Sequence, residues 1–554
     1  MNPVPPAAGP APTGRRLTDV SAAIRDLTGT APATRPGPGG DGDPVLRSLA
    51  LSTTTLEPGD LFVALPGTRS HGARFAARAF EAGAVAVLTD PEGLGELEDA
   101  GVTVPTLVVD GDLRALVARL AVWWHGDPAA GMTTFGVTGT NGKTTTTYLL
   151  ETLGRLLSRS VGLVGTVEIR SGRRVIPSVL TTPEAPDLQG YLAQMRDDGV
   201  GMLAMEVSSH ALAMRRVDGI RYDVAGFTNL SQDHLDFHET FEAYFAAKAA
   251  LFTPERSRRA VVCVDEEWGR RMAGVASVPV ATLATVPGAT GRGAGTSVDW
   301  VVRDVEEAPT GTSFVVGHRD GREVHVAISL PGAFNVSNAA LAVVMLVESG
   351  VDAAELDRVL VAAGVVDPQV PGRMELVGAE PRTIVDFAHN AEALGLALTA
   401  LRPTTEGRLV VVFGATGDRD RTKRPVMGRV AAELADVVVV TDDDPHLEAP
   451  GPIRAEVLAG ARSAVVAVTP QIHEISPREA AIRETIVRAR PTDTVLVAGR
   501  GHERWQDVGG VDRELDDRVE ARAALALRAP HEERGPALPQ DGERTQDEQG
   551  EGRR

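Results

Sequence analysis

The chain has 554 residues, which exceeds what one hydrophobic core supports and suggests about three domains. Its formal net charge of −19 argues against a nucleic-acid binder, although a small anionic substrate could still be held by local cations. The single cysteine, Cys263, excludes a disulfide framework and a cysteine-based zinc site. The sequence shows neither an apolar run long enough to span a membrane nor a secretory signal pattern, so we expect a cytoplasmic protein.

The two ends of the chain are predicted to lack a stable fold. Residues 1–42 are rich in Pro, Ala and Gly, and we expect most of them to form a flexible leader, with a candidate helix over 17–27. From residue 529 to residue 554 the sequence is polar and charged without apolar periodicity, which predicts a disordered tail.

Between the two ends, short apolar runs alternate with amphipathic segments such as 75–84 and 424–435. This alternation predicts an α/β architecture with mainly parallel sheets. Sequence breaks near 125–131 and 367–373 divide the chain into blocks of residues 43–129, 130–370 and 371–528. The predicted strands are 61–65, 84–88, 106–110, 133–139, 259–264, 408–414, 436–441 and 493–499.

Residues 133–153 read as a strand, a glycine turn and a helix, the arrangement of a phosphate-binding loop. Gly139 and Gly142 let the backbone approach an anion, Lys143 supplies a cation, and the Thr144 hydroxyl suits Mg²⁺. The spacing departs from GxxxxGK[ST], because Val137 stands where the first glycine would fall. The alternative is an ordinary turn before a helix. The loop alone predicts only that the chain binds a nucleoside triphosphate.

Carboxylates and imidazoles gather further along the chain. Glu206 stands at the end of an expected strand, and Asp233, His234, Asp236 and His238 fall within six residues. Beside a phosphate loop, such groups suggest ligands for a divalent metal that bridges phosphate oxygens. A solvated acidic loop is the alternative.

Six motifs carry a resemblance to a known family. GTNGKTT, EVSSHAL, NLSQDHLDFH with YFAAK, LPGAFNVSNA, GDRDRTKRPVMG and AGRGHERWQ occur in the order seen in the muramyl ligases, over roughly residues 45–527. Within this family the motifs are most similar to those of the enzymes that add the third residue to UDP-MurNAc-L-Ala-D-Glu. The resemblance implies an N-terminal UDP-binding α/β domain, a central P-loop ATPase-like domain and a C-terminal Rossmann-like domain that binds the amino acid.

The resemblance also implies roles in binding ATP and Mg²⁺. Lys143 corresponds to the lysine on the γ-phosphate, Thr144 with Glu206 to the first magnesium site, and His234 with Lys248 to the second. Lys248 would be carbamylated, because an ammonium repels Mg²⁺ whereas a carbamate is an anionic oxygen donor. The alternative for Lys248 is a surface lysine. The other implied nucleotide contacts are Gly139, Thr140, Asn141, Gly142, Thr145, Asn335, Asn338, Arg373 and Asp386.

The substrate contacts implied by the resemblance fall into three groups. Leu51, Thr53, Thr68, Arg69 and Ser70 match the uridine contacts, and Thr181, Thr182, Ser208 and Arg216 match the muramyl-dipeptide contacts. Arg419, Gly499 and Glu503 match positions that hold the common end of the incoming amino acid, next to Asp443, Asp444 and His446.

Several positions depart from the family pattern. Ser52 to Thr54 replace DSR, and Leu180, Met214 and Arg500 replace an Asn, a Gln and a Lys. Enzymes that add meso-diaminopimelate carry DNPR where this chain has DDPH at 443–446. His446 is not a fixed cation at pH 7 and lacks the bidentate fork of arginine. We therefore expect an L-lysine-type or L-ornithine-type amine rather than meso-diaminopimelate, and the adjacent Asp443 and Asp444 suit a cationic distal group.

The implied reaction joins a diamino acid to the D-Glu γ-carboxylate of UDP-MurNAc-L-Ala-D-Glu through an acyl phosphate, in peptidoglycan precursor synthesis. We expect a monomer that binds neither nucleic acid nor membrane. The alternatives are a meso-diaminopimelate-adding enzyme, a ligase like folylpolyglutamate synthetase, and a non-catalytic nucleotide-binding paralogue. Folylpolyglutamate synthetases begin almost at the phosphate loop, whereas here about 90 structured residues precede it.

Overall fold

A computed structural model describes residues 14–37, 43–67, 70–286, 298–308 and 311–528. The chain divides after Pro371 into two compact units. Every segment predicted as a strand forms one, and most of the pairings between them are parallel, so the predicted α/β class is confirmed. No helix within the described residues is long and apolar enough to cross a membrane.

The first unit begins with a small α/β domain. Its sheet has the order β2-β7-β6-β5-β4, with all neighbours parallel except β2 and β7. The strands are β1 (Arg15–Arg16), β2 (Ala33–Arg35), β3 (Val45–Leu46), β4 (Leu49–Ala50), β5 (Leu61–Val63), β6 (Ala86–Thr89) and β7 (Thr106–Val108), and the helices are α1 (Leu17–Thr28), α2 (Ala76–Glu81), α3 (Pro91–Asp99) and α4 (Leu113–His125).

The candidate helix over 17–27 is confirmed as α1, within the segment otherwise expected to be a flexible leader. Leu17, Val20 and Ile24 recur at helical spacing and are buried in the same apolar cluster as Leu120 and Trp124 of α4. Burial of a Leu, Val or Ile side chain contributes about 1.5–3 kcal/mol, which favours an ordered helix over a flexible segment. The part of the predicted leader from residue 14 to residue 37 therefore belongs to the N-terminal domain.

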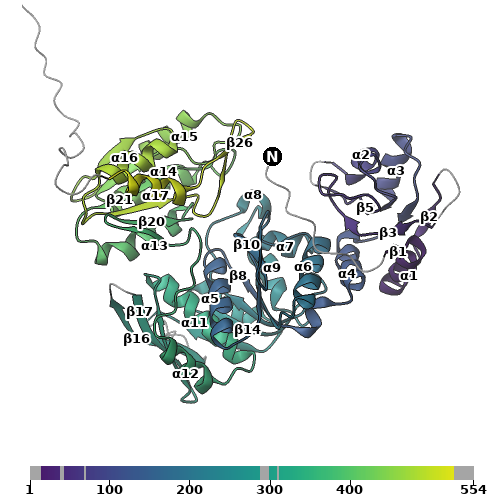
Figure 1. The fold of residues 1–554 in the computed structure, drawn as a ribbon, viewed down its shortest axis with the longest axis horizontal. Coiled ribbons are helices and arrows are strands. Elements are labelled where there is room, and N and C mark those ends of the chain that lie inside the picture. Colours follow the sequence, from purple (N-terminus) through teal and green to yellow (C-terminus); the bar gives the residue numbers. More distant parts are fainter. Residues whose placement is uncertain (1–13, 38–42, 68–69, 287–297, 309–310, 529–554) are drawn as a thin grey trace, which may run out of the picture. The chain divides into compact units, whose positions relative to one another are not determined.

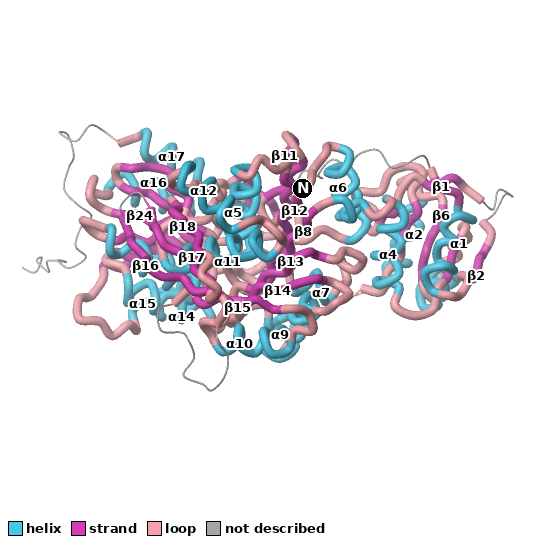
Figure 2. The backbone as a smooth tube through the Cα atoms, turned by 90° about the horizontal axis from the view of Figure 1, so that it is seen from below, coloured by secondary structure: helices cyan, strands magenta, loops and turns pink. Residues whose placement is uncertain are grey.

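The central domain is built on an eleven-stranded sheet of order β11-β10-β9-β12-β8-β13-β14-β15-β16-β17-β18. The strands from β9 to β16 are parallel, and both edges are antiparallel. Figure 2 shows strands β12, β8, β13 and β14 of this sheet side by side. The strands are β8 (Thr133–Thr138), β9 (Val161–Val164), β10 (Glu168–Ser171), β11 (Arg174–Pro177), β12 (Met202–Glu206), β13 (Tyr222–Phe227), β14 (Ser257–Cys263), β15 (Val280–Ala284), β16 (Trp300–Ala308), β17 (Gly311–His318) and β18 (Glu323–Ile328).

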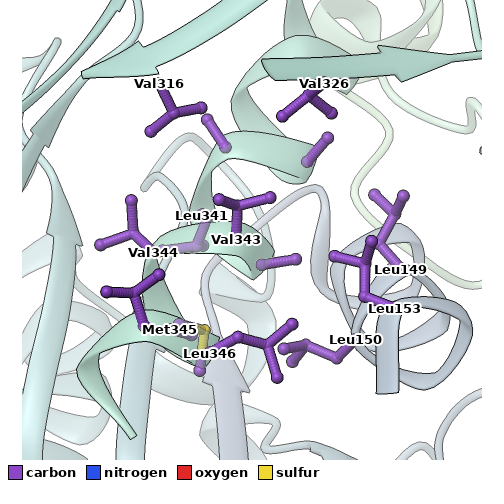
Figure 3. Close-up of a cluster of buried hydrophobic side chains, with 14 of the residues drawn as sticks. Leu149, Leu150, Leu153, Val316, Val326, Leu341, Val343, Val344, Met345 and Leu346 are labelled. Atoms are coloured by element: carbon purple, nitrogen blue, oxygen red, sulfur yellow. The ribbon is translucent and has the colours of Figure 1, made fainter. Parts of the chain in front are cut away.

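Helix α11 anchors this sheet because it is apolar on every side. Its side chains lie between those of α5 and those of β17 and β18, as Leu341, Val344 and Leu346 show in Figure 3. The helices of the domain are α5 (Lys143–Leu156), α6 (Ala185–Asp197), α7 (Ser209–Ala213), α8 (Leu235–His238), α9 (Phe241–Ala249), α10 (Glu267–Val275), α11 (Ala333–Glu348) and α12 (Ala353–Ala363).

The second unit has a six-stranded sheet of order β19-β20-β24-β21-β22-β23, parallel except at β19 and flanked by helices (Figure 1). The strands are β19 (Glu375–Ala379), β20 (Arg382–Asp386), β21 (Leu409–Phe413), β22 (Val437–Val440), β23 (Gln471–Glu474), β24 (Thr494–Ala498), β25 (Trp505–Val508) and β26 (Val511–Glu514), and the helices are α13 (Ala391–Leu401), α14 (Lys423–Leu434), α15 (Pro450–Arg462), α16 (Arg478–Arg488) and α17 (Asp517–Ala526).

In the central sheet the strand order reverses beside β8, because the chain passes from β8 to β9 and β12 on one side and then to β13 on the other. Open α/β sheets bind ligands at the carboxyl ends of the strands next to such a switch point. The loops that follow β8, β12 and β13 meet there, and they carry the residues singled out by sequence.

Candidate functional site

The phosphate loop lies between β8 and α5. Helix α5 begins at Lys143, and no side chain caps its N-terminus at Gly142. The first backbone N–H groups of a helix face its N-terminal end, which suits an anion. Gly142 has φ 87°, and a Cβ there would lie 2.2 Å from Oδ1 of Asn338, so only glycine fits. Thus α11 brings Asn338, and Asn335 beside it at 3.3 Å, against this loop.

The loop is fixed by residues that follow β13. The Asn141 N–H donates to Oδ1 of Asn229 at 2.9 Å, and the Thr228 hydroxyl donates to the Asn141 carbonyl at 2.6 Å. The Thr140 N–H donates to the Asn229 carbonyl at 3.0 Å, and its hydroxyl lies 3.1 Å from the Tyr244 hydroxyl. These contacts fix the backbone of the loop before any ligand binds.

Two lysine Nζ atoms converge on one carbonyl of the loop. Nζ of Lys143 lies 3.0 Å and Nζ of Lys248 2.8 Å from the Gly139 oxygen. Lys248 is 1% exposed, with Nζ 4.4 Å from the Tyr244 ring centre. Burial, and next the charge of Lys143, holds the pKa of Lys248 well below its ordinary value. The position of Lys248 excludes the surface-lysine alternative, and the neutral amine is the form that reacts with CO₂.

Glu206 ends β12 and is fully buried. Its Oε2 accepts from the Thr144 hydroxyl at 3.0 Å and the Thr166 hydroxyl at 3.1 Å, and its Oε1 accepts from the Thr166 N–H at 2.8 Å. The structure therefore joins Thr144 to Glu206, as the proposed first metal site requires. The sequence alone did not single out Thr166, because a lone threonine has no local signature.

The predicted muramyl-dipeptide contacts lie next to Glu206. The Thr182 hydroxyl donates to the Glu206 carbonyl at 2.9 Å and accepts from the Ser208 N–H at 3.1 Å. Arg216 donates to the Thr182 carbonyl at 3.2 Å and pairs with Glu184 at 2.7 Å. Thr182, Ser208 and Arg216 are thus brought together beside the backbone of Glu206, and Thr181 is linked to the carboxylate through the Thr166 hydroxyl, which lies 3.1 Å from its own.

His234 lies in a group of rings rather than in a cluster of carboxylates. Its ring centre is 4.9 Å from that of His210 and 6.2 Å from that of Tyr244, and its Nε2 is 3.6 Å from Oδ2 of Asp233. His238 lies 2.9 Å from the Ser209 hydroxyl. Among the described side chains, which do not include that of Asp236, no three His, Cys, Asp or Glu groups are placed to hold a metal ion.

In the second unit, predicted contacts follow the carboxyl ends of parallel strands. Asp386 ends β20 and accepts from the N–H groups of Met374 and Ala388 at 2.7 and 2.9 Å. Burial raises its pKa, against the opposing charge of Arg373. The Arg373 guanidinium lies 4.2 Å from the ring centre of Phe387.

Asp443 and Asp444 follow β22 and differ in their partners. Burial opposes ionisation of Asp443, but Arg478 and Arg500 outweigh it and lower its pKa. Burial, and next the charge of Asp443, raises the pKa of Asp444, which contacts the buried Arg500 guanidinium. Desolvation raises the pKa of Glu503 to about 8, although its side chain is 35% exposed and Arg500 lies 3.5 Å away. Gly499 is in the same group, since a Cβ there would lie 2.5 Å from Oδ2 of Asp443.

A fully buried arginine that the sequence did not single out holds these loops. Arg478 pairs with Asp517 at 2.7 Å, with neither side chain exposed. It also donates to the carbonyls of Asp442 at 3.0 Å and Ala498 at 2.9 Å, at the ends of β22 and β24. Although burial disfavours the cation, Asp517 keeps the pKa of Arg478 above its ordinary value. Arg478 thereby fixes the turns that carry Asp443 and Gly499.

His446 is held by the β25–β26 hairpin. Its Nδ1 lies 2.9 Å from Oδ2 of Asp507, and this hydrogen bond is the main cause that lowers the pKa of Asp507.

The remaining predicted substrate contacts lie on loops. Arg419 is exposed on the loop after β21. In the N-terminal domain, Leu51 and Thr53 follow β4 and Ser70 lies in the loop after β5, whereas Thr68 and Arg69 lie outside the described residues.

Comparison with known proteins identifies the family to which this chain belongs. Three family models match consecutive parts of the chain, the Mur ligase family catalytic domain at residues 46–121, the Mur ligase middle domain at 137–346 and the Mur ligase glutamate ligase domain at 372–501. The UDP-N-acetylmuramoyl-L-alanyl-D-glutamate–2,6-diaminopimelate ligase of Corynebacterium glutamicum is 46% identical over 493 residues, covering 87% of this chain and 92% of that one. The chain belongs to the Mur ligase family.

Two further proteins support this Mur ligase assignment. The UDP-N-acetylmuramyl-tripeptide synthetase of Leifsonia xyli subsp. xyli is 45% identical, over 88% of this chain and 93% of that one. A solved UDP-N-acetylmuramoyl-L-alanyl-D-glutamate–2,6-diaminopimelate ligase has a TM-score of 0.56 at 28% identity and covers 87% of this chain and 95% of that one. The predicted family and the enzyme class of ATP-dependent acid–amino-acid ligases are thus confirmed.

The names of these Mur ligase relatives do not favour the expected lysine or ornithine. The relatives from Corynebacterium glutamicum and two Streptomyces species, at 45–46% identity, are named as 2,6-diaminopimelate ligases. The alternative of a meso-diaminopimelate-adding enzyme is therefore better supported than the lysine or ornithine that His446 led us to expect. The model matched at residues 46–121 also disfavours a folylpolyglutamate synthetase, which would begin near the phosphate loop.

Carbamylation of Lys248 can be detected directly, because the chain has only three lysines, Lys143, Lys248 and Lys423. We expect ¹³C NMR of the protein in ¹³C-bicarbonate to show one carbamate resonance, since the lowered pKa of Lys248 favours the neutral amine that reacts with CO₂. The Lys248→Met variant should lose the resonance and the Lys423→Arg control should keep it. A signal that persists in Lys248→Met would contradict the assignment.

Breaking the buried Arg478–Asp517 pair should strongly destabilise the second unit. Asp517→Asn leaves the Arg478 charge buried without its counter-ion, which costs about 3–5 kcal/mol. Chemical denaturation followed by circular dichroism measures the change. Glu484→Gln is the matched control, because it breaks an exposed pair with Arg488 and should cost less than about 1 kcal/mol. Equal effects of the two changes would refute a structural role for the buried pair.

Proposed function

We propose that this Mur ligase adds a diamino acid to the D-Glu γ-carboxylate of UDP-MurNAc-L-Ala-D-Glu, at the expense of ATP, in cytoplasmic peptidoglycan precursor synthesis. The observation that carries the proposal is the contact of Thr144, the first threonine of α5, with the buried Glu206 carboxylate. This contact places an oxygen-rich site at the phosphate loop and directly beside the threonines assigned to the muramyl dipeptide.

The donor set fits the expected Mg²⁺. A buried carboxylate held only by hydroxyl and amide donors retains oxygen lone pairs for a hard cation, which prefers such ligands. Thr144 with Glu206 would hold one ion, and His234 with carbamylated Lys248 a second. When bound, Mg²⁺ neutralises the charge that develops on the transferring phosphoryl group.

The reaction needs no side-chain nucleophile. The D-Glu γ-carboxylate attacks the γ-phosphorus of ATP, which forms an acyl phosphate and releases ADP. The amine of the incoming amino acid then attacks the acyl carbon, loses a proton and displaces phosphate. Lys143 and the N-terminus of α5, which begins at Lys143, stabilise the phosphoryl oxygens in the first step. Their fixed positive field offsets the repulsion between two anionic reactants.

For the amino acid, meso-diaminopimelate is our first candidate, supported by the names of the relatives at 45–46% identity. L-Lysine or L-ornithine is the second, and His446 favours it. Asp507 accepts from the Nδ1–H of His446, so a neutral ring presents Nε2 as an acceptor. An acceptor suits a distal ammonium, whereas a protonated ring would donate to a distal carboxylate.

Turnover with separate amines tests the proposal. With ATP, Mg²⁺ and UDP-MurNAc-L-Ala-D-Glu, we expect phosphate release to be fastest with meso-diaminopimelate, and slower with L-lysine or L-ornithine. Mass spectrometry of the product identifies the residue added. Faster release with lysine or ornithine would reverse the order of the two candidates, and no release with any amine would refute the tripeptide step.

The variant Asp444→Asn/His446→Arg restores the DNPR pattern and serves as the matched comparison. It should raise kcat/KM for meso-diaminopimelate relative to lysine, because arginine offers a fixed bidentate cation to the distal carboxylate. An unchanged ratio would show that residue 446 does not face the distal group.

A further inference from the structure

The connection between β9 and β10, residues 165–167, contacts both halves of the site. Thr166 binds the Glu206 carboxylate twice, through its N–H at 2.8 Å to Oε1 and through its hydroxyl at 3.1 Å to Oε2. Gly165 lets the connection approach, since a Cβ there would lie 2.4 Å from Oε1 of Glu206. The backbone is thus closed over the carboxylate that we assign to the metal.

The same hydroxyl also reaches the substrate threonines. Oγ1 of Thr166 lies 3.1 Å from Oγ1 of Thr181, as well as 3.1 Å from Oε2 of Glu206. A hydroxyl has one proton, so the two acceptors compete for it. Any change at Glu206 therefore changes how strongly Thr166 can bind Thr181, and the reverse holds equally.

Residues on both sides of the connection hold it in place. Before it, β9 is paired along β12 in the sheet. After it, Glu168 accepts from the Tyr148 hydroxyl at 2.9 Å and pairs with Arg170, which binds Glu151 at 3.0 Å. Tyr148 and Glu151 belong to α5, the helix of the phosphate loop. Thr166 is therefore positioned by the nucleotide-binding helix itself.

We propose that Thr166 is a positioning residue that couples the metal–nucleotide site to the muramyl-dipeptide site. A cation held by Glu206 would weaken its carboxylate as a hydrogen-bond acceptor, so that Thr166 would donate more strongly to Thr181 and order the dipeptide-binding threonines. Because linkage is reciprocal, bound UDP-dipeptide tightens cation binding by the same factor. This inference rests on the proposed function, since it assumes both ligands.

Equilibrium binding measures the coupling without turnover. Calorimetry with ADP present gives the Kd of UDP-MurNAc-L-Ala-D-Glu without Mn²⁺ and with saturating Mn²⁺, and the electron paramagnetic resonance signal of free Mn²⁺ gives the reciprocal change. In the wild type we expect Mn²⁺ to lower this Kd by about fivefold or more. Thr166→Val should bring the ratio close to one, and Thr166→Ser, which keeps the hydroxyl, should retain it.

Thr134→Val is the matched control, because the buried Thr134 hydroxyl bonds Asp223 at 3.1 Å at the opposite end of β8. Its coupling ratio should equal that of the wild type. If circular dichroism shows that Thr166→Val does not fold, Thr166→Ala takes its place. A wild-type ratio of one, or an undiminished ratio in Thr166→Val, overturns the inference alone. Failure of the wild type to bind the UDP-dipeptide or Mn²⁺ overturns the proposed function as well.

Discussion

The buried carboxylate of Glu206 is the constraint on which the rest of the central site depends. A carboxylate without access to water must be compensated by donors or by a cation. The parallel register of β12 and β8 places Glu206 opposite Val137, just before the phosphate loop begins. Thr144 of α5 and Thr166 after β9 then supply the donors. The phosphate loop, the β9–β10 connection and the threonines assigned to the substrate are consequently arranged around the charge of Glu206.

A buried charge organises the second unit in a similar way. Arg478 and Asp517 neutralise each other in a core without exposure, and the remaining donors of Arg478 bind the backbone where β22 and β24 end. Removal of one partner leaves the other uncompensated, which makes such pairs effective at fixing loops. This pair therefore fixes the positions of the residues on the two loops, which are Asp443, Asp444, Gly499 and Arg500.

The sequence predicted the elements whose local pattern is strong. The β-branched strands, the glycine turn before Lys143 and the order of the motifs needed no tertiary information. Thr166, Arg478 and Asp517 were missed because a lone threonine, arginine or aspartate has no local signature. The register of β9 on β12 brings Thr166 to Glu206, and the packing of α16 and α17 brings Arg478 to Asp517. Helix α1 was only a candidate within a leader read as flexible, since the Pro/Gly-rich composition around it outweighed the apolar spacing of Leu17, Val20 and Ile24.

Manganese binding to the near-isosteric variant Glu206→Gln tests the central claim most directly. The amide keeps the shape of the side chain but removes the charge that we assign to the metal at the phosphate loop. With ADP present and the fold verified by circular dichroism, the electron paramagnetic resonance signal should show tight Mn²⁺ binding to the wild type and at least about tenfold weaker binding to the variant, a loss of about 1.4 kcal/mol. Equal Mn²⁺ affinity in the two proteins would contradict the account.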